Sequence, residues 1–176
     1  MENLTAPLVN RVAQSGLITI NLEDFFPKAE IVGLDLKGWL FREMILREKD
    51  FRESLKTHDW AQYAGKNLAV FCSVDAIVPM WAWMLVAASA GPFAADIYQG
   101  TPEEMVKHHF SKTMAAFKTE NFAGKRVVIK GCSDQPVPAS AYLELTRLLQ
   151  PVAQSIMFGE PCSTVPVFKS KPEKQV

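Results

Sequence analysis

The sequence has no surplus of charge of either sign. Its 176 residues carry 19 Lys and Arg against 19 Asp and Glu, so the formal net charge at pH 7 is zero. Opposite charges also alternate locally, as in Arg47-Glu48-Lys49-Asp50, which is typical of solvated helix faces. A nucleic-acid-binding protein needs a basic surplus to neutralise phosphates. We therefore expect no nucleic-acid partner.

The sequence also lacks a long apolar run. The longest extends from Ala76 to Ala90, contains Pro79 and Ser89, and falls short of the roughly 20 apolar residues that span a bilayer. The first residues, Met1-Glu2-Asn3-Leu4, have neither the basic nor the apolar part of a signal peptide. We expect no membrane association and a cytoplasmic location.

The sequence contains few cysteines and no glycine-rich nucleotide-binding motif. The chain has three Cys, none of them in a Cys-x-x-Cys pair, and a cytoplasmic protein keeps such thiols reduced. Its nine Gly form neither a GxGxxG pattern nor a Walker loop. These absences argue against a disulfide framework, and we expect no nucleotide cofactor.

The composition is that of an ordinary globular protein. Apolar residues make up 48% of the chain and charged residues 22%, and a chain of this length can bury a sizeable core. We expect a single domain over residues 1–176. In it, an N-terminal strand and helix segment (1–66) packs on a core (67–168), and residues 169–176 form a flexible tail.

The N-terminal segment mixes strand and helix patterns. Residues 17–22 alternate apolar and polar side chains like a half-buried strand, and residues 30–34 read as a second strand. Asp35 is placed to cap a helix over residues 36–46, and a second helix is expected over 49–57.

From residue 67 the pattern becomes a regular alternation of strands and helices. Short apolar strands are expected over four segments: 68–72, 96–98, 126–130 and 155–158. Helices are expected from Pro79, over 102–118 with Thr101 and Glu104 as a capping box, and over 138–149. This alternation predicts an α/β fold with three layers and a mainly parallel central sheet, built as βαβαβαβ from residue 67.

Every cysteine is followed by serine and comes shortly after an expected strand. The three pairs are Cys72-Ser73, Cys132-Ser133 and Cys162-Ser163. In an open parallel sheet the carboxyl ends of the strands lie on one edge, where ligands bind. We therefore expect the three thiols to converge, although they are far apart in sequence.

Three converging thiolates would suit a soft metal. Together with a fourth ligand they give the tetrahedral set preferred by zinc or by iron–sulfur clusters. Asp75 and Asp134 follow two of the cysteines and are candidate fourth ligands or proton acceptors. The predicted metal site consists of Cys72, Cys132, Cys162, Asp134 and Asp75.

Three alternatives remain open at this point. One cysteine could act as the nucleophile of a thiol-dependent enzyme, with His58, His108 or His109 as base. The cysteines could be ordinary packing residues, because free Cys is often buried. The protein could also be a non-catalytic interaction protein that forms a homodimer through a stripe containing Trp81 and Trp83.

Four segments resemble a known family: CSVDAIVP (72–79), VVIKGC (127–132), PVPASAY (136–142) and GEPCSTVP (159–166). They are similar to an uncharacterised bacterial family, domain of unknown function 2480 (DUF2480), over nearly the whole chain from Asn10 to Lys169. The family brings no established activity, so whether the protein is an enzyme stays open. Genes for iron–sulfur assembly proteins near those of the family imply such proteins as partners. The resemblance thus favours a thiolate site used in iron–sulfur cluster assembly or trafficking.

Overall fold

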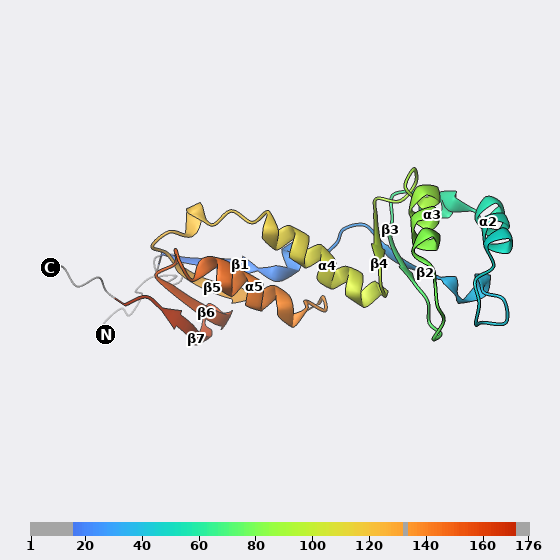
Figure 1. Ribbon diagram of the computed structural model, residues 1–176. Helices are drawn as coiled ribbons and strands as arrows, with labels where there is room; N and C mark the ends of the chain where they lie inside the picture. Colours follow the sequence, from blue (N-terminus) through green and yellow to red (C-terminus); the bar gives the residue numbers. More distant parts are fainter. Residues whose placement is uncertain (1–15, 132–133, 172–176) are drawn as a thin grey trace, which may run out of the picture. The chain divides into compact units, whose positions relative to one another are not determined.

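The computed structural model describes residues 16–131 and 134–171 (Figure 1). The chain divides into two compact units. Unit 1 contains residues 1–26 and 110–176, and unit 2 contains the intervening residues 27–109. Each unit has its own sheet and its own buried core. The single-domain organisation stays a prediction.

The sheet of unit 1 has the strand order β1-β5-β6-β7. β1 (Leu17–Asn21), β5 (Arg126–Lys130) and β6 (Ser155–Glu160) run parallel, and β7 (Ser163–Lys169) pairs antiparallel with β6. β5 lies between two parallel neighbours, and its three central residues, all β-branched, are buried. A continuous apolar run is the expected signature of such a central strand.

Helix α5 (Ala139–Leu149) connects β5 to β6 in unit 1. Its buried residues Ala141, Leu145 and Leu149 recur at a spacing of four and form one apolar stripe. Helix α4 (Pro102–Ala115) contributes the buried Phe110 and Met114 of its C-terminal part to the same unit. The 3₁₀ helices Leu22–Phe25 and Glu120–Phe122 follow β1 and precede β5.

Unit 2 is built on a second parallel sheet, with the order β2-β3-β4. Its strands are β2 (Ile31–Asp35), β3 (Asn67–Phe71) and β4 (Asp96–Gln99). Helices α2 (Glu48–Thr57) and α3 (Met80–Ala90) lie in the connections between these strands, together with the 3₁₀ helices Leu36–Trp39 and Trp60–Tyr63.

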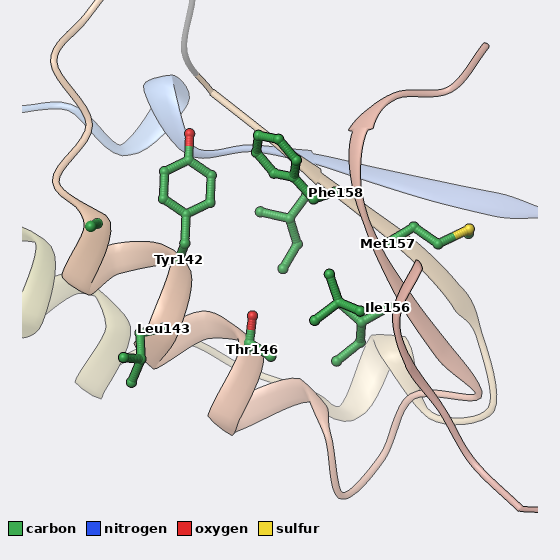
Figure 2. Close-up of a pocket in the computed structure, with 9 residues that line it drawn as sticks. Tyr142, Leu143, Thr146, Ile156, Met157 and Phe158 are labelled. Carbon is green, nitrogen blue, oxygen red and sulfur yellow. The ribbon is translucent and has the colours of Figure 1, made fainter. Parts of the chain in front are cut away.

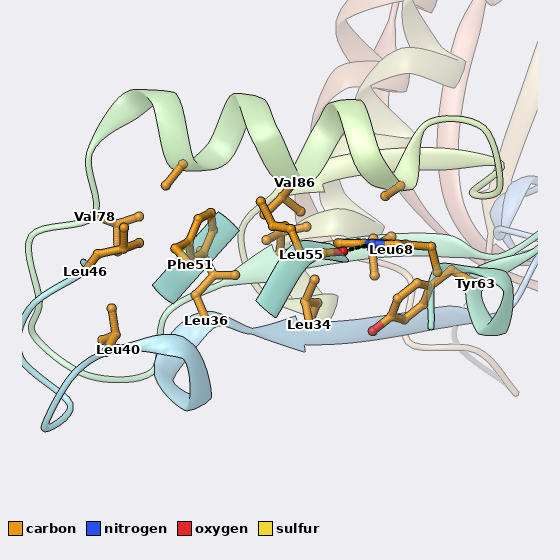
Figure 3. Packing of buried hydrophobic residues seen from close by; sticks show 14 residues of the cluster. Leu34, Leu36, Leu40, Leu46, Phe51, Leu55, Tyr63, Leu68, Val78 and Val86 are labelled. Atoms are coloured by element: carbon orange, nitrogen blue, oxygen red, sulfur yellow. Dashed lines mark hydrogen bonds between the residues drawn. The ribbon is translucent and has the colours of Figure 1, made fainter. Parts of the chain in front are cut away.

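The core of unit 2 fills the space between α3 and the sheet (Figure 3). Phe51 and Leu55 of α2 point inward at helical spacing, and both meet Leu68 and Val86 in one apolar cluster. The indole N–H of Trp60 is buried there and donates to the carbonyl of Leu55 at 2.8 Å. Its polar atom is therefore satisfied within the core.

Most of the predicted elements are confirmed. The α/β fold is correct, and Asp35 does cap a helix by accepting from the Lys37 N–H at 2.9 Å. The capping box of α4 also forms, because the Thr101 N–H donates to Glu104 Oε2 at 2.8 Å and the Glu104 N–H to Thr101 Oγ1 at 3.3 Å.

Three expectations are corrected by the structure. The single central sheet is wrong, because the strands divide between two sheets and the N-terminal strand β1 pairs with β5. The helix expected over 36–46 is only the 3₁₀ helix Leu36–Trp39, followed by a tight turn at residues 41–45. β7 was not expected; its Pro166 is tolerated because β7 is an edge strand.

Within the described residues, every helix is too short or too polar to traverse a bilayer.

Candidate functional site

The carboxyl ends of β5 and β6 meet at one edge of the unit 1 sheet. The two strands are parallel neighbours, with Ile129 opposite Phe158 in the register. The segments that follow them therefore leave the sheet side by side. Cys162 lies in the two-residue turn between Glu160 and Ser163, and its side chain is exposed. Cys132 lies outside the described residues, two positions after the end of β5.

The backbone on both sides of residues 132–133 is held in place. Gly131 has φ +139°, and a Cβ at this position would lie 3.0 Å from the Cβ of Leu22, so only glycine fits without strain. The Tyr142 hydroxyl donates to the carbonyl of Gly131. On the other side, the Asp134 N–H donates to Glu23 Oε1 at 3.0 Å.

Carboxylates surround this edge of the sheet. Glu23 belongs to the 3₁₀ helix after β1, Asp134 to the segment after β5, and Glu160 to the end of β6. Lys130 Nζ lies 3.1 Å from both carboxylate oxygens of Glu160 and partly neutralises it. Carboxylates next to thiols provide both possible metal ligands and proton acceptors.

Cys72 and Ser73 follow β3 in unit 2, and both make hydrogen bonds within that unit. The half-buried Cys72 Sγ donates to the Val74 carbonyl at 3.5 Å. The Ser73 N–H and hydroxyl donate to Asp35 Oδ1 and Oδ2 at 3.1 and 2.5 Å. Asp35 also caps the helix after β2, so it joins the ends of two neighbouring strands.

The pKa of Asp35 is lowered below its ordinary value of 3.8. Burial is the largest single contribution and raises the pKa. The hydrogen bonds from the Ser73 hydroxyl and from the Lys37 and Ser73 backbone amides, helped by the charge of Lys37, outweigh it together. Asp35 is thus held as a carboxylate by the contacts that it organises.

The expected convergence of three thiols at one sheet edge rested on a single sheet, and that premise is wrong. β3 belongs to a different sheet from β5 and β6, so Cys72 and the exposed Asp75 follow a strand end of unit 2. Residues 132–134 and Cys162 follow strands of unit 1. Over residues 16–131 and 134–171, no three His, Cys, Asp or Glu side chains form a group that could hold a metal ion. The ligand set stays a prediction, because Cys132 is outside these ranges.

The candidate bases also lie in unit 2. His58 packs edge-on against Trp39 and Trp60, and its Nε2 is 3.0 Å from the Tyr63 hydroxyl. Burial lowers the pKa of His58, while the charge of Asp59 partly offsets this effect. His108 stacks on Tyr98 of β4, with 4.5 Å between ring centroids. These contacts give both histidines packing roles within their unit.

An apolar pocket lies beside the strand ends of unit 1, between α5 and the β5–β7 part of the sheet (Figure 2). Its volume is about 400 Å³, within the range of small-molecule sites. The pocket is lined by Tyr142, Leu143 and Thr146 of α5 and by Ile156, Met157 and Phe158 of β6, and Ile129, Ala139 and Val167 complete the lining.

This pocket was not predicted from the sequence. It depends on the hairpin of β6 and β7, which brings Val167 next to β6, and β7 was not expected. One available signal was the small Ala139 and Thr146, which lie seven positions apart and therefore on one face of α5. Small side chains leave room where large ones would fill the interface.

The comparisons with known proteins gave one match. A family model described as "Protein of unknown function (DUF2480)" matches residues 6–170. No curated protein and no solved structure matches the chain.

Proposed function

The chain belongs to the DUF2480 family, whose function is unknown, and we propose that it binds a thiophilic metal at the β5–β6 edge of unit 1. The ligands in this proposal are Cys132 and Cys162, assisted by the carboxylate of Asp134. Compared with the set expected from the sequence, the proposal leaves out Cys72 and Asp75.

The observation that carries this proposal is the parallel pairing of β5 with β6. Because Ile129 and Phe158 are partners in the register, the chain reaches Cys132 and Cys162 from neighbouring strands after three and four residues. Strands in a sheet are about 4.8 Å apart. Segments that start so close together can bring two sulfur atoms onto one ion.

The donor chemistry fits zinc or iron. Two thiolates and a carboxylate leave a fourth position for water or for a partner's ligand, unlike the closed four-ligand sites that are purely structural. Cys162 is exposed, so an incoming carrier can reach its sulfur. An open, accessible site of this kind suits transfer of iron or of a cluster, which is why we retain iron–sulfur assembly or trafficking as the role.

The test is metal analysis of protein purified without oxygen, combined with three serine variants. We expect about one equivalent of zinc or iron per chain, falling more than tenfold in Cys132→Ser and in Cys162→Ser. Cys72→Ser is the matched control, since Cys72 follows a strand of the other sheet, and it should keep the metal. A wild-type protein with less than about a tenth of an equivalent would contradict the proposal.

A second candidate is a thiol-dependent enzyme acting on an apolar substrate at the same edge. The apolar pocket favours it, because the pocket residue Tyr142 donates to Gly131, the residue before Cys132. Phe158, which also lines the pocket, lies four residues before Cys162. An apolar molecule in the pocket would therefore lie next to the segments that carry both thiols.

Alkylation rates test this candidate, with Cys72 as an internal control. The ratio of modification at Cys132 or Cys162 to that at Cys72 would be measured by mass spectrometry, once with N-phenylmaleimide and once with iodoacetamide. If the pocket recruits the apolar reagent, the ratio rises about tenfold with N-phenylmaleimide, and the pocket-filling variant Thr146→Trp abolishes the rise. Equal ratios for both reagents would exclude this candidate.

A further inference from the structure

Unit 2 exposes an unusual amount of apolar surface around the start of α3. Five large side chains are involved: Met44 (67% exposed), Ile45 (59%), Ile77 (88%), Met80 (75%) and Met84 (71%). We call these five residues the methionine patch. Single exposed apolar residues are normal, whereas a contiguous group marks an interaction surface.

The segments that carry the five residues are adjacent in the structure. Ile45 and Ile77 face each other in an isolated parallel β-bridge, which puts their side chains on the same side. Met44 precedes Ile45, and Met80 follows Ile77 by three residues. Met84 lies one helical turn beyond Met80 on the same face of α3.

The chain holds part of this patch in a strained turn. Phe41 and Ile45 close a tight turn, with the Phe41 N–H donating to the Ile45 carbonyl at 2.7 Å. The two residues at its tip, Arg42 and Glu43, have φ values of +53° and +57°, which non-glycine residues rarely adopt. Such strain persists where the conformation that it produces is useful.

Helix α3 has no polar face to present to water. Residues 76–95 contain no charged side chain at all. Trp81 and Trp83, expected from the sequence to form a contact face, are half-buried and pack against the core of unit 2. The exposed side of α3 consists of Met80 and Met84 followed by Ala87 and Ala88. A helix that is apolar all round normally has a partner on every side.

We propose that the methionine patch binds a second copy of this chain in a two-fold symmetric dimer. The exposed face of α3 carries large side chains (Met80 and Met84) at its N-terminal end and small ones (Ala87 and Ala88) at its C-terminal end. Two such helices in antiparallel contact place Met80 of one copy against Ala88 of the other, so the surface is complementary to itself. A two-fold interface requires this self-complementarity. The uncharged segment 76–95 also adds no like-charge repulsion between copies.

The patch is large enough for this role. Burial of one Leu, Ile or Met side chain removes on the order of 100 Å² of apolar surface from water, so the patch offers about 350 Å² per copy. Two copies would bury about 700 Å² of apolar surface. Because about 60% of a typical interface is apolar, this corresponds to a total of about 1,200 Å², the lower end of the range for specific interfaces. The charged Arg42 and Glu43 at the edge of the patch supply the polar rim that such interfaces have.

The test is sedimentation equilibrium of the full chain and of three variants. We expect the wild-type protein to dimerise between about 1 μM and about 200 μM. Met84→Glu and Ala88→Glu each place a charge in the contact and should weaken dimerisation at least about 30-fold. Leu143→Glu is the matched control, because Leu143 is 69% exposed on α5 of unit 1, and it should leave the dimer unchanged.

A wild-type protein that stays monomeric over this range would overturn the proposal. Dimers that survive Met84→Glu, or that are lost equally in Leu143→Glu, would place the interface elsewhere. Circular dichroism of each variant establishes that it is folded. All the substituted residues are exposed, so the variants should fold like the wild type.

Discussion

Asp35 shows at the residue scale how one side chain can join two strand ends. Its carboxylate accepts from the Lys37 N–H and from both donors of Ser73. We predict that Asp35→Ala destabilises unit 2 by about 1–2 kcal/mol, the usual cost of losing a helix cap. Urea unfolding followed by tryptophan fluorescence measures this change.

The same residue predicts a pH dependence. The pKa of Asp35 in the folded state lies below the ordinary value of 3.8 that it has in the unfolded chain. The stabilisation is therefore complete above this value and is lost as the pH falls through the folded pKa. Asp35→Asn should remove this part of the acid sensitivity. Asp75→Asn, at an exposed position two residues beyond Ser73, is the control and should behave like the wild type. Identical acid profiles for Asp35→Asn and the wild type would contradict the explanation.

The residue types alone predicted part of the hydrogen bonding of Asp35. Asp35 was expected as a cap, because Asp before an apolar residue is a frequent helix start. Its bond to Ser73, 38 positions away, was not expected, since it depends on the pairing of β2 with β3. This local bonding gives Ser73, the second residue of the first Cys-Ser pair, a structural role.

At the scale of elements, the turn at residues 41–45 gives the clearest prediction. Glu43 has φ +57°, a conformation that costs a non-glycine residue about 1–2 kcal/mol. Glu43→Gly should therefore stabilise the protein by about 1 kcal/mol, after the backbone entropy of glycine is counted. The exposed ion pair between Lys37 and Glu43 contributes little to this balance. Thermal unfolding measures the shift.

A glycine in ordinary helical conformation is the control for this variant. Glu53→Gly, at an exposed position inside α2, should destabilise by about 1 kcal/mol, because glycine is a poor helix former. The two substitutions are chemically identical and differ only in backbone conformation. A loss of stability in Glu43→Gly would show that the turn carries no strain.

Elements with strong local signals were predictable, and those defined by distant partners were not. β5 was predicted with its observed bounds, because a run of β-branched residues between charged ones is a strong signal. β7 exists only by pairing with β6, and its Pro166 conceals it. Because β7 was not predicted, the apolar pocket was not predicted either, since the β6–β7 hairpin forms one of its walls.

At the scale of the whole molecule, local patterns could not assign strands to sheets. The alternation of strands and helices predicts parallel crossovers, and they are observed. Whether β5 continues from β4 or returns to β1 depends on contacts more than 100 positions apart in sequence. The proposed metal site depends on this pairing of β5 with β1, because the pairing determines which cysteines follow strands of the same sheet.

The division into two units, each with its own core, leads to a last prediction. Leu68 in unit 2 and Leu145 in unit 1 are both fully buried. Each Leu→Ala change should cost about 2–5 kcal/mol, and we expect each to act mainly on its own unit. All four tryptophans (Trp39, Trp60, Trp81 and Trp83) belong to unit 2, so their fluorescence reports on that unit alone.

Urea unfolding of the two variants separates the units. Leu68→Ala should lower the urea midpoint of the fluorescence transition. Leu145→Ala should leave this midpoint near the wild-type value and should lower the midpoint of only part of the unfolding transition seen by circular dichroism. If both variants shift both signals equally, the chain unfolds as one cooperative structure. The single-domain expectation would then be correct, because cores that unfold together are energetically one.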